Sequence, residues 1–171
     1  MRLIKAPEEF EYNSNDVKVF LAGGISNCED WQSKVAEELQ NEPDDLILID
    51  PRSDKFDRDD DKAEIRQISW EFKMLEKCDI FSMYFCGSES VQPICMYELG
   101  RNIVRMQNRF PTVDEWGHRI IITADPNYKR YKDVFIQGNL ATGMLIYINE
   151  SLDEHIYQIR KSYHRLRRDP K

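Results

Sequence analysis

The chain has 171 residues, a net charge of -7 and a pI near 5.1. Phosphate polymers and anionic lipid surfaces are bound largely by cationic side chains, so this acidic balance argues against a nucleic-acid or membrane partner and favours a small ligand. No stretch approaches the roughly 18 continuous apolar residues of a membrane span, and residues 1–16 lack the apolar core of a signal peptide. We expect a cytoplasmic protein with a single domain over residues 1–171.

Cysteine and histidine spacing predicts neither a disulfide framework nor a metal site. The three histidines are scattered, and the cysteines form no CxxC pair and lie beside apolar segments, so reduced thiols are expected. The alternating aspartates of residues 54–62, DKFDRDDDK, lack the glycine and the bidentate glutamate of a calcium loop and predict a solvated loop. The four cysteines are Cys28, Cys78, Cys86 and Cys95.

The first half of the chain alternates between strand and helix patterns. Residues 17–24, VKVFLAGG, form a β-branched run that ends in two glycines, and helical spacing follows over residues 27–42 with Asn27 as a candidate cap. Residues 44–52, DDLILIDPR, predict a second buried strand closed by Pro51. A second helix is expected over residues 63–78.

The second half continues the alternation. Residues 79–85, DIFSMYF, predict a third strand, and a helix is expected from Gln92 or Pro93 to about residue 108. Residues 118–126 predict a fourth strand, residues 133–144 a helix, and residues 145–148, LIYI, a possible fifth strand. Ser151 and Glu154 form a capping box for a last helix over residues 151–168.

This alternation predicts a doubly wound α/β fold, flavodoxin-like or Rossmann-like, with a parallel sheet of about five strands in three layers. In such folds ligands bind beyond the carboxyl ends of the strands, where the strand order reverses. We therefore expect the turn AGGIS (residues 22–26), the DPR segment (residues 50–52) and residues 86–100 to be neighbours.

Two glutamates near this edge have more than one interpretation from spacing alone. Glu98 follows an apolar turn of its helix, and it is either a desolvated carboxylate beside the ligand or an exposed side chain paired with Arg101 or Asn102. Glu71, in the stretch SWEF, is equally compatible with an exposed pair to Lys73 or Lys77.

The segments VFLAGGIS, IDPR, SWEFKMLEKCDIFSMYF and YELGR, in this order and spacing, resemble the nucleoside 2-deoxyribosyltransferase family, especially its shorter phage and bacterial members. The similarity spans roughly residues 17–148. Members cleave the bond between a base and 2-deoxyribose, and the glutamate of their ELG motif attacks the anomeric carbon. The resemblance therefore implies that Glu98 is the nucleophile and that Glu71, eight residues before Asp79, delivers a proton to the base.

Further residues are expected to bind substrate. The resemblance implies that glycines in the first turn let the backbone approach the ligand and that a small polar residue binds a sugar hydroxyl or a phosphate. The candidates in that turn are Gly23, Gly24 and Ser26. Asp50 and Arg52 are placed to read a base edge or a phosphate, or else to form a turn with a surface ion pair.

This chain departs from the family pattern at three positions. Glu71 stands where family members usually carry an aspartate, which is one methylene shorter. Where transferases keep an aspartate for the sugar hydroxyl, and related deoxynucleotide N-hydrolases keep a phosphate-binding serine, this chain has Gln92, with Ser88 and Ser90 nearby. The first-strand tyrosine of many members is replaced by Phe20, and Tyr97 is a candidate to supply the missing hydroxyl.

The resemblance implies deoxyribosyl transfer between a nucleoside and a free base, without metal or organic cofactor. The alternative in the same class is hydrolysis of a nucleoside 5'-monophosphate. A flavodoxin-like binding module without catalysis is the alternative from another class. Because family members are homo-oligomers whose neighbours complete the pocket, the resemblance also implies at least a dimer.

Overall fold

The computed structural model describes residues 1–53, 60 and 62–168, and within them the strands form one parallel six-stranded sheet in the order β1-β3-β2-β4-β5-β6. The strands are β1 Arg2–Lys5, β2 Val17–Gly23, β3 Leu46–Asp50, β4 Ile80–Phe85, β5 Ile120–Ala124 and β6 Ile148–Asn149. The predicted doubly wound α/β class is confirmed.

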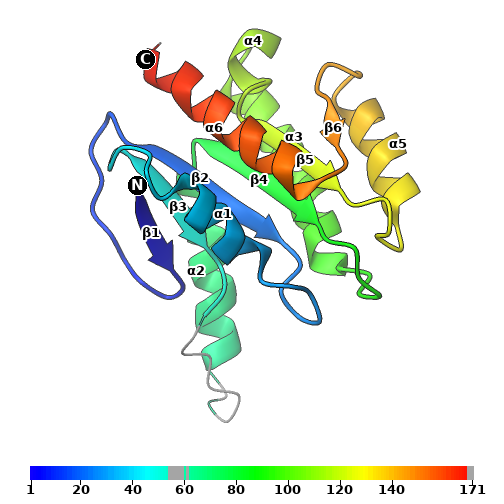
Figure 1. Cartoon of the computed structure of the whole chain (residues 1–171), viewed down its shortest axis with the longest axis horizontal. Helices are drawn as coiled ribbons and strands as arrows, with labels where there is room; N and C mark the ends of the chain where they lie inside the picture. Colours follow the sequence, from blue (N-terminus) through cyan, green and yellow to red (C-terminus); the bar gives the residue numbers. More distant parts are fainter. Residues whose placement is uncertain (54–59, 61, 169–171) are drawn as a thin grey trace.

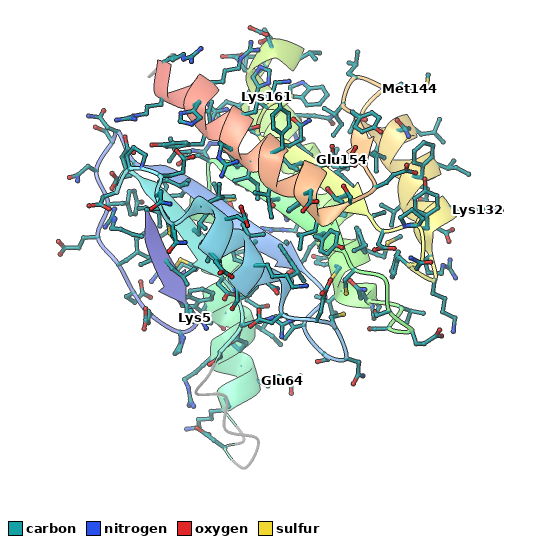
Figure 2. The ribbon with its side chains drawn as sticks, viewed as in Figure 1. Lys5, Glu64, Lys132, Met144, Glu154 and Lys161 are labelled. Atoms are coloured by element: carbon teal, nitrogen blue, oxygen red, sulfur yellow. The ribbon has the colours of Figure 1, made fainter. Side chains whose placement is uncertain are left out.

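Helices cover both faces of the sheet and give three layers (Figure 1). Helices α1 (Trp31–Leu39) and α6 (Leu152–Arg168) pack on one face. Helices α2 (Ala63–Lys77), α3 (Pro93–Arg109) and α5 (Tyr131–Ala141) pack on the other, together with the short α4 (Val113–Trp116). Charged side chains such as Glu64, Lys132 and Lys161 lie on the outer surfaces of the helices (Figure 2).

Burial on both faces explains why the central strands read as continuous apolar runs. Successive side chains alternate between the two cores. In β2, Val19 and Leu21 join the core under α1 and α6, whereas Phe20 and Ala22 join the core under α2 and α3. All five residues of β3 are buried.

Two strands differ from the sequence prediction. The edge strand β1 was not expected, because RLIK is four residues long and only partly buried, which leaves a weak pattern. The last strand comprises Ile148 and Asn149, whereas residues 145–148 were expected, and Leu145 and Tyr147 are exposed instead.

Helix starts were predicted with mixed success. The expected cap of α1, Asn27, is wrong: Asn27 lies in a turn with φ 58°, and Asp30 caps the helix by accepting a hydrogen bond from the backbone N–H of Ser33 at 3.1 Å. The start of α3 at Pro93 and the capping box of α6 are confirmed. In that box Ser151 N donates to Glu154 Oε2 at 3.2 Å.

The topology fixes where a ligand site is expected. Strand β2 has β3 on one side and β4 on the other, so the connections that leave β2 and β4 run to opposite sides of the strand order. Crevices of this kind at the carboxyl edge are the usual ligand position in open α/β sheets. The turn after β2 and the segment from β4 to α3 meet there.

Candidate active site

A cavity of about 220 Å³ lies at the carboxyl ends of β2 and β4. Its walls come from four parts of the chain: the end of β2 and its turn, the residue after β3, the middle of α2, and the start of α3. The predicted neighbours therefore meet. The lining residues are Phe20, Ala22, Gly23, Gly24, Ile25, Ser26, Pro51, Glu71, Ser90, Gln92, Pro93, Ile94, Cys95 and Glu98.

Glu98, in the second turn of α3, lines this cavity and does not form the surface pairs considered above. Arg101 instead pairs with Glu76, and the Asn102 side chain donates to the backbone oxygen of Glu98 at 2.9 Å. Burial, and then the charge of Glu71, raise the pKa of Glu98 to about 7, although Arg101 opposes the shift.

Glu71 reaches the cavity from α2. Neither lysine considered as its partner binds it in the described residues, and Lys73 pairs with Glu9 at 2.6 Å. Gln67 Nε2 instead donates to Glu71 Oε1 and to the backbone oxygen of Pro51, both at 2.7 Å. Burial raises the pKa of Glu71, and the hydrogen bond from Gln67 opposes this.

Gln67 was not among the predicted residues. The one signal for it in the sequence is the i, i+4 spacing between Gln67 and Glu71 on a helix, which places both side chains on one face. The spacing does not reveal that the same amide also anchors Pro51, because that contact joins α2 to the end of β3.

The glycine turn after β2 is required by packing. Gly23 has φ 153°, and a Cβ there would lie 2.2 Å from the backbone oxygen of Tyr84. A Cβ on Gly24 would lie 2.4 Å from Cys28 Sγ and 2.7 Å from Gln92 Oε1. Both glycines therefore allow close approach of chain segments at the cavity wall, and Ser26 is exposed at the same wall.

Gln92 is held in an unusual conformation just before α3. It has φ 44° and is buried. Its Nε2 donates to the backbone oxygen of Cys86 and to Ser88 Oγ, both at 3.4 Å. Its Oε1 is buried without a hydrogen-bond partner in the described residues. Gln92, a lining residue, thus keeps one buried acceptor without a partner, which is costly unless a donor reaches it.

Four predicted binding residues lie outside the cavity lining. Tyr97 is 68% exposed and does not line the cavity. Ser88 contacts Gln92 instead. Asp50 is buried and accepts a hydrogen bond from Arg52 N at 2.9 Å. The Arg52 side chain donates to Gln32 Oε1 at 2.7 Å, and together these contacts tie the start of α1 to the end of β3.

The buried Asp50 carboxylate is a cost to stability at neutral pH. Burial is the main reason that its pKa rises from 3.8 to about 6, despite the Arg52 N–H and Lys5, and Oδ2 has no hydrogen-bond partner in the described residues. Because the folded-state pKa is the higher one, the folded state holds the proton more tightly. Stability is therefore lost as the pH rises from 3.8 through 6.

We expect Asp50→Asn to raise the free energy of unfolding by roughly 2–3 kcal/mol at pH 8, since each pKa unit is worth about 1.4 kcal/mol and Asn keeps an oxygen for Arg52 N. Below pH 3.8 the gain should be small. Urea unfolding at pH 8 and at a pH below 3.8 measures this difference in the free energy of unfolding. The control is Asp44→Asn, whose side chain is 93% exposed and which should change stability little at either pH. A destabilised Asp50→Asn protein at pH 8 would contradict this account.

The family model described as nucleoside 2-deoxyribosyltransferase like matches residues 16–115, which is more than half of the chain. The chain belongs to this family. The matched region includes every residue that lines the cavity, from Phe20 to Glu98. A comparison with curated protein sequences gives no match.

The described residues form neither a metal site nor a membrane span. They contain no group of three or more His, Cys, Asp and Glu side chains placed to hold a metal ion. Residues 54–59 and 61, in the aspartate-rich stretch, lie outside the described part. None of the described helices is long and apolar enough to cross a membrane.

Proposed function

We propose that the protein cleaves the N-glycosidic bond of 2-deoxyribonucleosides and transfers the deoxyribosyl group to another base. The observation that carries the proposal is the pair of carboxylates, Glu98 from α3 and Glu71 from α2, on one cavity at the carboxyl edge of the sheet. Membership of the nucleoside 2-deoxyribosyltransferase-like family supports the substrate class.

The proposed reaction has two displacements. The Glu98 carboxylate attacks the anomeric carbon, and the electron pair of the breaking glycosidic bond goes to the base nitrogen, which takes a proton from Glu71. This leaves a deoxyribosyl ester on Glu98. A second base, deprotonated by Glu71, then attacks the same carbon and releases Glu98 as a carboxylate, so the configuration is retained overall.

The electrostatics of the cavity suit this division of roles. A nucleophilic carboxylate must be poorly solvated, and the burial that raises the pKa of Glu98 indicates such an environment. None of the described lining residues is cationic, and the charge of Arg101 does not offset burial and the charge of Glu71 at Glu98. The pair therefore loses its last proton near neutral pH. That proton lies mainly on Glu98, whose pKa is raised more, and the productive form is the one in which the proton is on Glu71 and Glu98 is ionised.

We expect a bell-shaped dependence of kcat/KM on pH, with the alkaline limb near pH 7. Above this pH the pair loses its last proton and the acid is gone, whereas at low pH both carboxylates are protonated and the nucleophile is gone. In Glu71→Gln, assayed with a substrate whose leaving group needs no proton, activity should rise with pH to a plateau. An alkaline limb that persists in this variant would contradict the assignment.

The cavity favours a nucleoside over a 5'-monophosphate. The free acceptor on the wall, Gln92 Oε1, matches a sugar hydroxyl that donates a hydrogen bond, whereas a phosphate dianion offers only acceptors. The lack of cationic side chains among the described lining residues points the same way, because phosphate sites usually use Arg or Lys. The amino end of α3 is the one described feature of the wall that a phosphate could use.

The assay that tests the proposal incubates the protein with one 2-deoxyribonucleoside and a different free base, and separately with the matching 5'-monophosphate in water. Transfer predicts a new nucleoside in the first reaction. If only free deoxyribose or its phosphate is formed, whether or not the second base is present, the protein is a hydrolase. Cleavage of the monophosphate alone would overturn the nucleoside assignment.

We further propose that the protein assembles at least as a dimer through the outer faces of α2 and α3. These faces carry large exposed apolar side chains beside the cavity, and Ile94 both lines the cavity and is 64% exposed. A second copy that covers Ile94 would also wall the cavity. The exposed residues are Ile65, Ile68 and Phe72 on α2, and Ile94, Tyr97 and Val104 on α3.

Light scattering after size-exclusion chromatography tests the assembly. The wild type should have at least twice the mass of one chain, and Tyr97→Asp should shift it toward the monomer. The matched control is Tyr157→Asp, on the exposed face of α6, which should leave the mass unchanged. A monomeric wild type at micromolar concentration would refute this part of the proposal.

A further inference from the structure

Two cysteine thiols meet beside the cavity, at a place that the proposed chemistry does not use. Cys28 lies in the loop between β2 and α1, and Cys86 follows β4 directly. Both sulfur atoms contact one hydroxyl, Ser88 Oγ, at 3.5 Å from Cys28 and 3.8 Å from Cys86. Because one oxygen contacts both sulfur atoms, the two thiols lie close together, and Cys28 packs on the apolar cluster that contains Cys86.

We propose that Cys28 and Cys86 form a reversible redox pair, which a low-molecular-weight disulfide oxidises to an intramolecular disulfide that narrows the neighbouring cavity. The cross-link itself depends only on the thiol geometry. The effect on turnover rests on the proposed function.

The two cysteines differ in burial and in local structure, and these differences decide which thiol reacts first. Cys86 is buried at the end of a central strand of the sheet. Cys28 is half-buried in a loop of turns, residues 24–30, which has no regular secondary structure. Cys28 is therefore the thiol that reagents in solution reach, and its loop is the part that moves when the sulfur atoms bond.

The proposed oxidation balances as two thiol–disulfide exchanges. The Cys28 thiolate attacks one sulfur of a disulfide such as oxidised glutathione, which breaks the reagent's S–S bond and releases one reagent thiolate. The Cys86 thiolate then attacks Cys28 Sγ in the mixed disulfide and expels the second reagent thiolate. The two protons lost by the cysteines end on the two released thiols.

The second exchange is expected to be the slow one. Burial, and then the neighbouring Cys28 thiol, raise the pKa of the Cys86 thiol to about 12, so little thiolate is present at neutral pH. The position of both sulfur atoms beside Ser88 Oγ compensates in part, because the attack is intramolecular. Oxidation should therefore take place more readily at alkaline pH.

The disulfide would act on the cavity through two direct contacts. A Cβ at Gly24 would lie only 2.4 Å from Cys28 Sγ, so a shift of this sulfur moves the turn whose residues 23–26 form one wall. On the other side, Gln92 Nε2 contacts Cys86 Sγ at 3.7 Å and its backbone oxygen at 3.4 Å. A bond between the sulfurs therefore disturbs the glycine turn and Gln92 together.

The test treats the purified protein with oxidised glutathione at pH 8, followed by intact mass, peptide mapping without reduction, and amide hydrogen exchange. We expect a mass loss of two hydrogen atoms, one cross-link between Cys28 and Cys86, slower exchange in residues 22–30, and reversal by dithiothreitol. With a 2-deoxyribonucleoside, kcat/KM should fall about tenfold or more and recover on reduction, since small displacements at a site are costly.

Variants separate the possible outcomes. Cys28→Ser should block the cross-link and keep full activity under oxidant, and Cys86→Ser should stop at a glutathione adduct on Cys28. Cys78→Ser, at a buried thiol that donates to Leu75 O at 3.2 Å, is the control that should behave as the wild type. A cross-link to Cys95, or persistent glutathionylation of the wild type, would overturn the pairing. An oxidised protein with unchanged exchange and unchanged turnover would overturn the effect on the cavity.

These experiments distinguish a failure of the proposed enzymatic function from a failure of the proposed redox pair. If the reduced protein cleaves no deoxynucleoside, the proposed function is wrong, yet mass mapping and hydrogen exchange still test the redox pair. If the reduced protein is active but no cross-link forms, only the redox pair is wrong.

Discussion

Replacing Glu98 with alanine is expected to lower the rate of glycosidic cleavage by at least about a thousandfold, because the carboxylate supplies the attacking atom of both displacements. The fold should be retained. The carboxylate is partly desolvated, its pKa is raised to about 7, and no hydrogen bond to it is found within the described residues. Loss of the carboxylate therefore removes a desolvation cost and breaks no hydrogen bond within the described residues.

The control for this variant is Glu89→Ala, an exposed glutamate in the loop before α3, which should keep wild-type turnover. Circular dichroism and the melting temperature check that both variants fold. Wild-type turnover in a folded Glu98→Ala protein would remove Glu98 from the mechanism. Loss of activity in both variants would indicate that the loop before α3, and not the carboxylate, is the sensitive element.

The second large effect is expected for Glu71→Gln. With a natural base as the leaving group, we expect a loss of about a hundredfold or more, because an unprotonated base is a poor leaving group. With a deoxyriboside whose leaving group is a stable anion, such as a nitrophenolate, the loss should be small. Steady-state kcat/KM for the two substrates gives the comparison. Gln is similar in size, so it replaces the acid while filling the same space.

The matched control is Glu76→Gln, on the same helix but paired with Arg101 on the outer surface. It should slow neither substrate. If Glu71→Gln slows both substrates equally, Glu71 positions the ligand and is not the proton donor.

Much of the fold was predictable because strand and helix patterns alternate and the central strands are continuous apolar runs. The failures occur where the local signal is weak. The RLIK segment of β1 is partly buried, and its pairing with β3 places it at the edge of the sheet, which four residues do not encode by themselves. The cap of α1 is Asp30 and not the predicted Asn27, because residues 26–28 form a turn before the helix begins.

The two carboxylates of the candidate site were easier to predict than the contacts of the long polar side chains near it. Spacing alone left open whether Glu98 and Glu71 were exposed; the family resemblance placed both at the site, and the structure brings both to one cavity. The direction of a long side chain was not predictable. Arg52 donates to Gln32 on α1 and does not line the cavity. The sequence does not show this contact, because it depends on tertiary packing. The same holds for Gln67, which bridges Glu71 and Pro51.

The central claim is that Glu98 forms a covalent bond with the sugar, and trapping tests it most directly. A 2-fluoro-2-deoxynucleoside with a reactive leaving group should react once and then stall, because fluorine destabilises the cationic transition states of both steps while the leaving group assists only the first. Glu98→Ala serves as the control, since it lacks the atom that would be modified.

The intact mass should increase by one fluorodeoxyribosyl group, and peptide mapping should place it on Glu98 within residues 90–101, SVQPICMYELGR. An added acceptor base should release the adduct faster than water does. An adduct on another residue would contradict the account. So would rapid turnover without any adduct, which would instead favour direct attack by water with Glu98 as a general base.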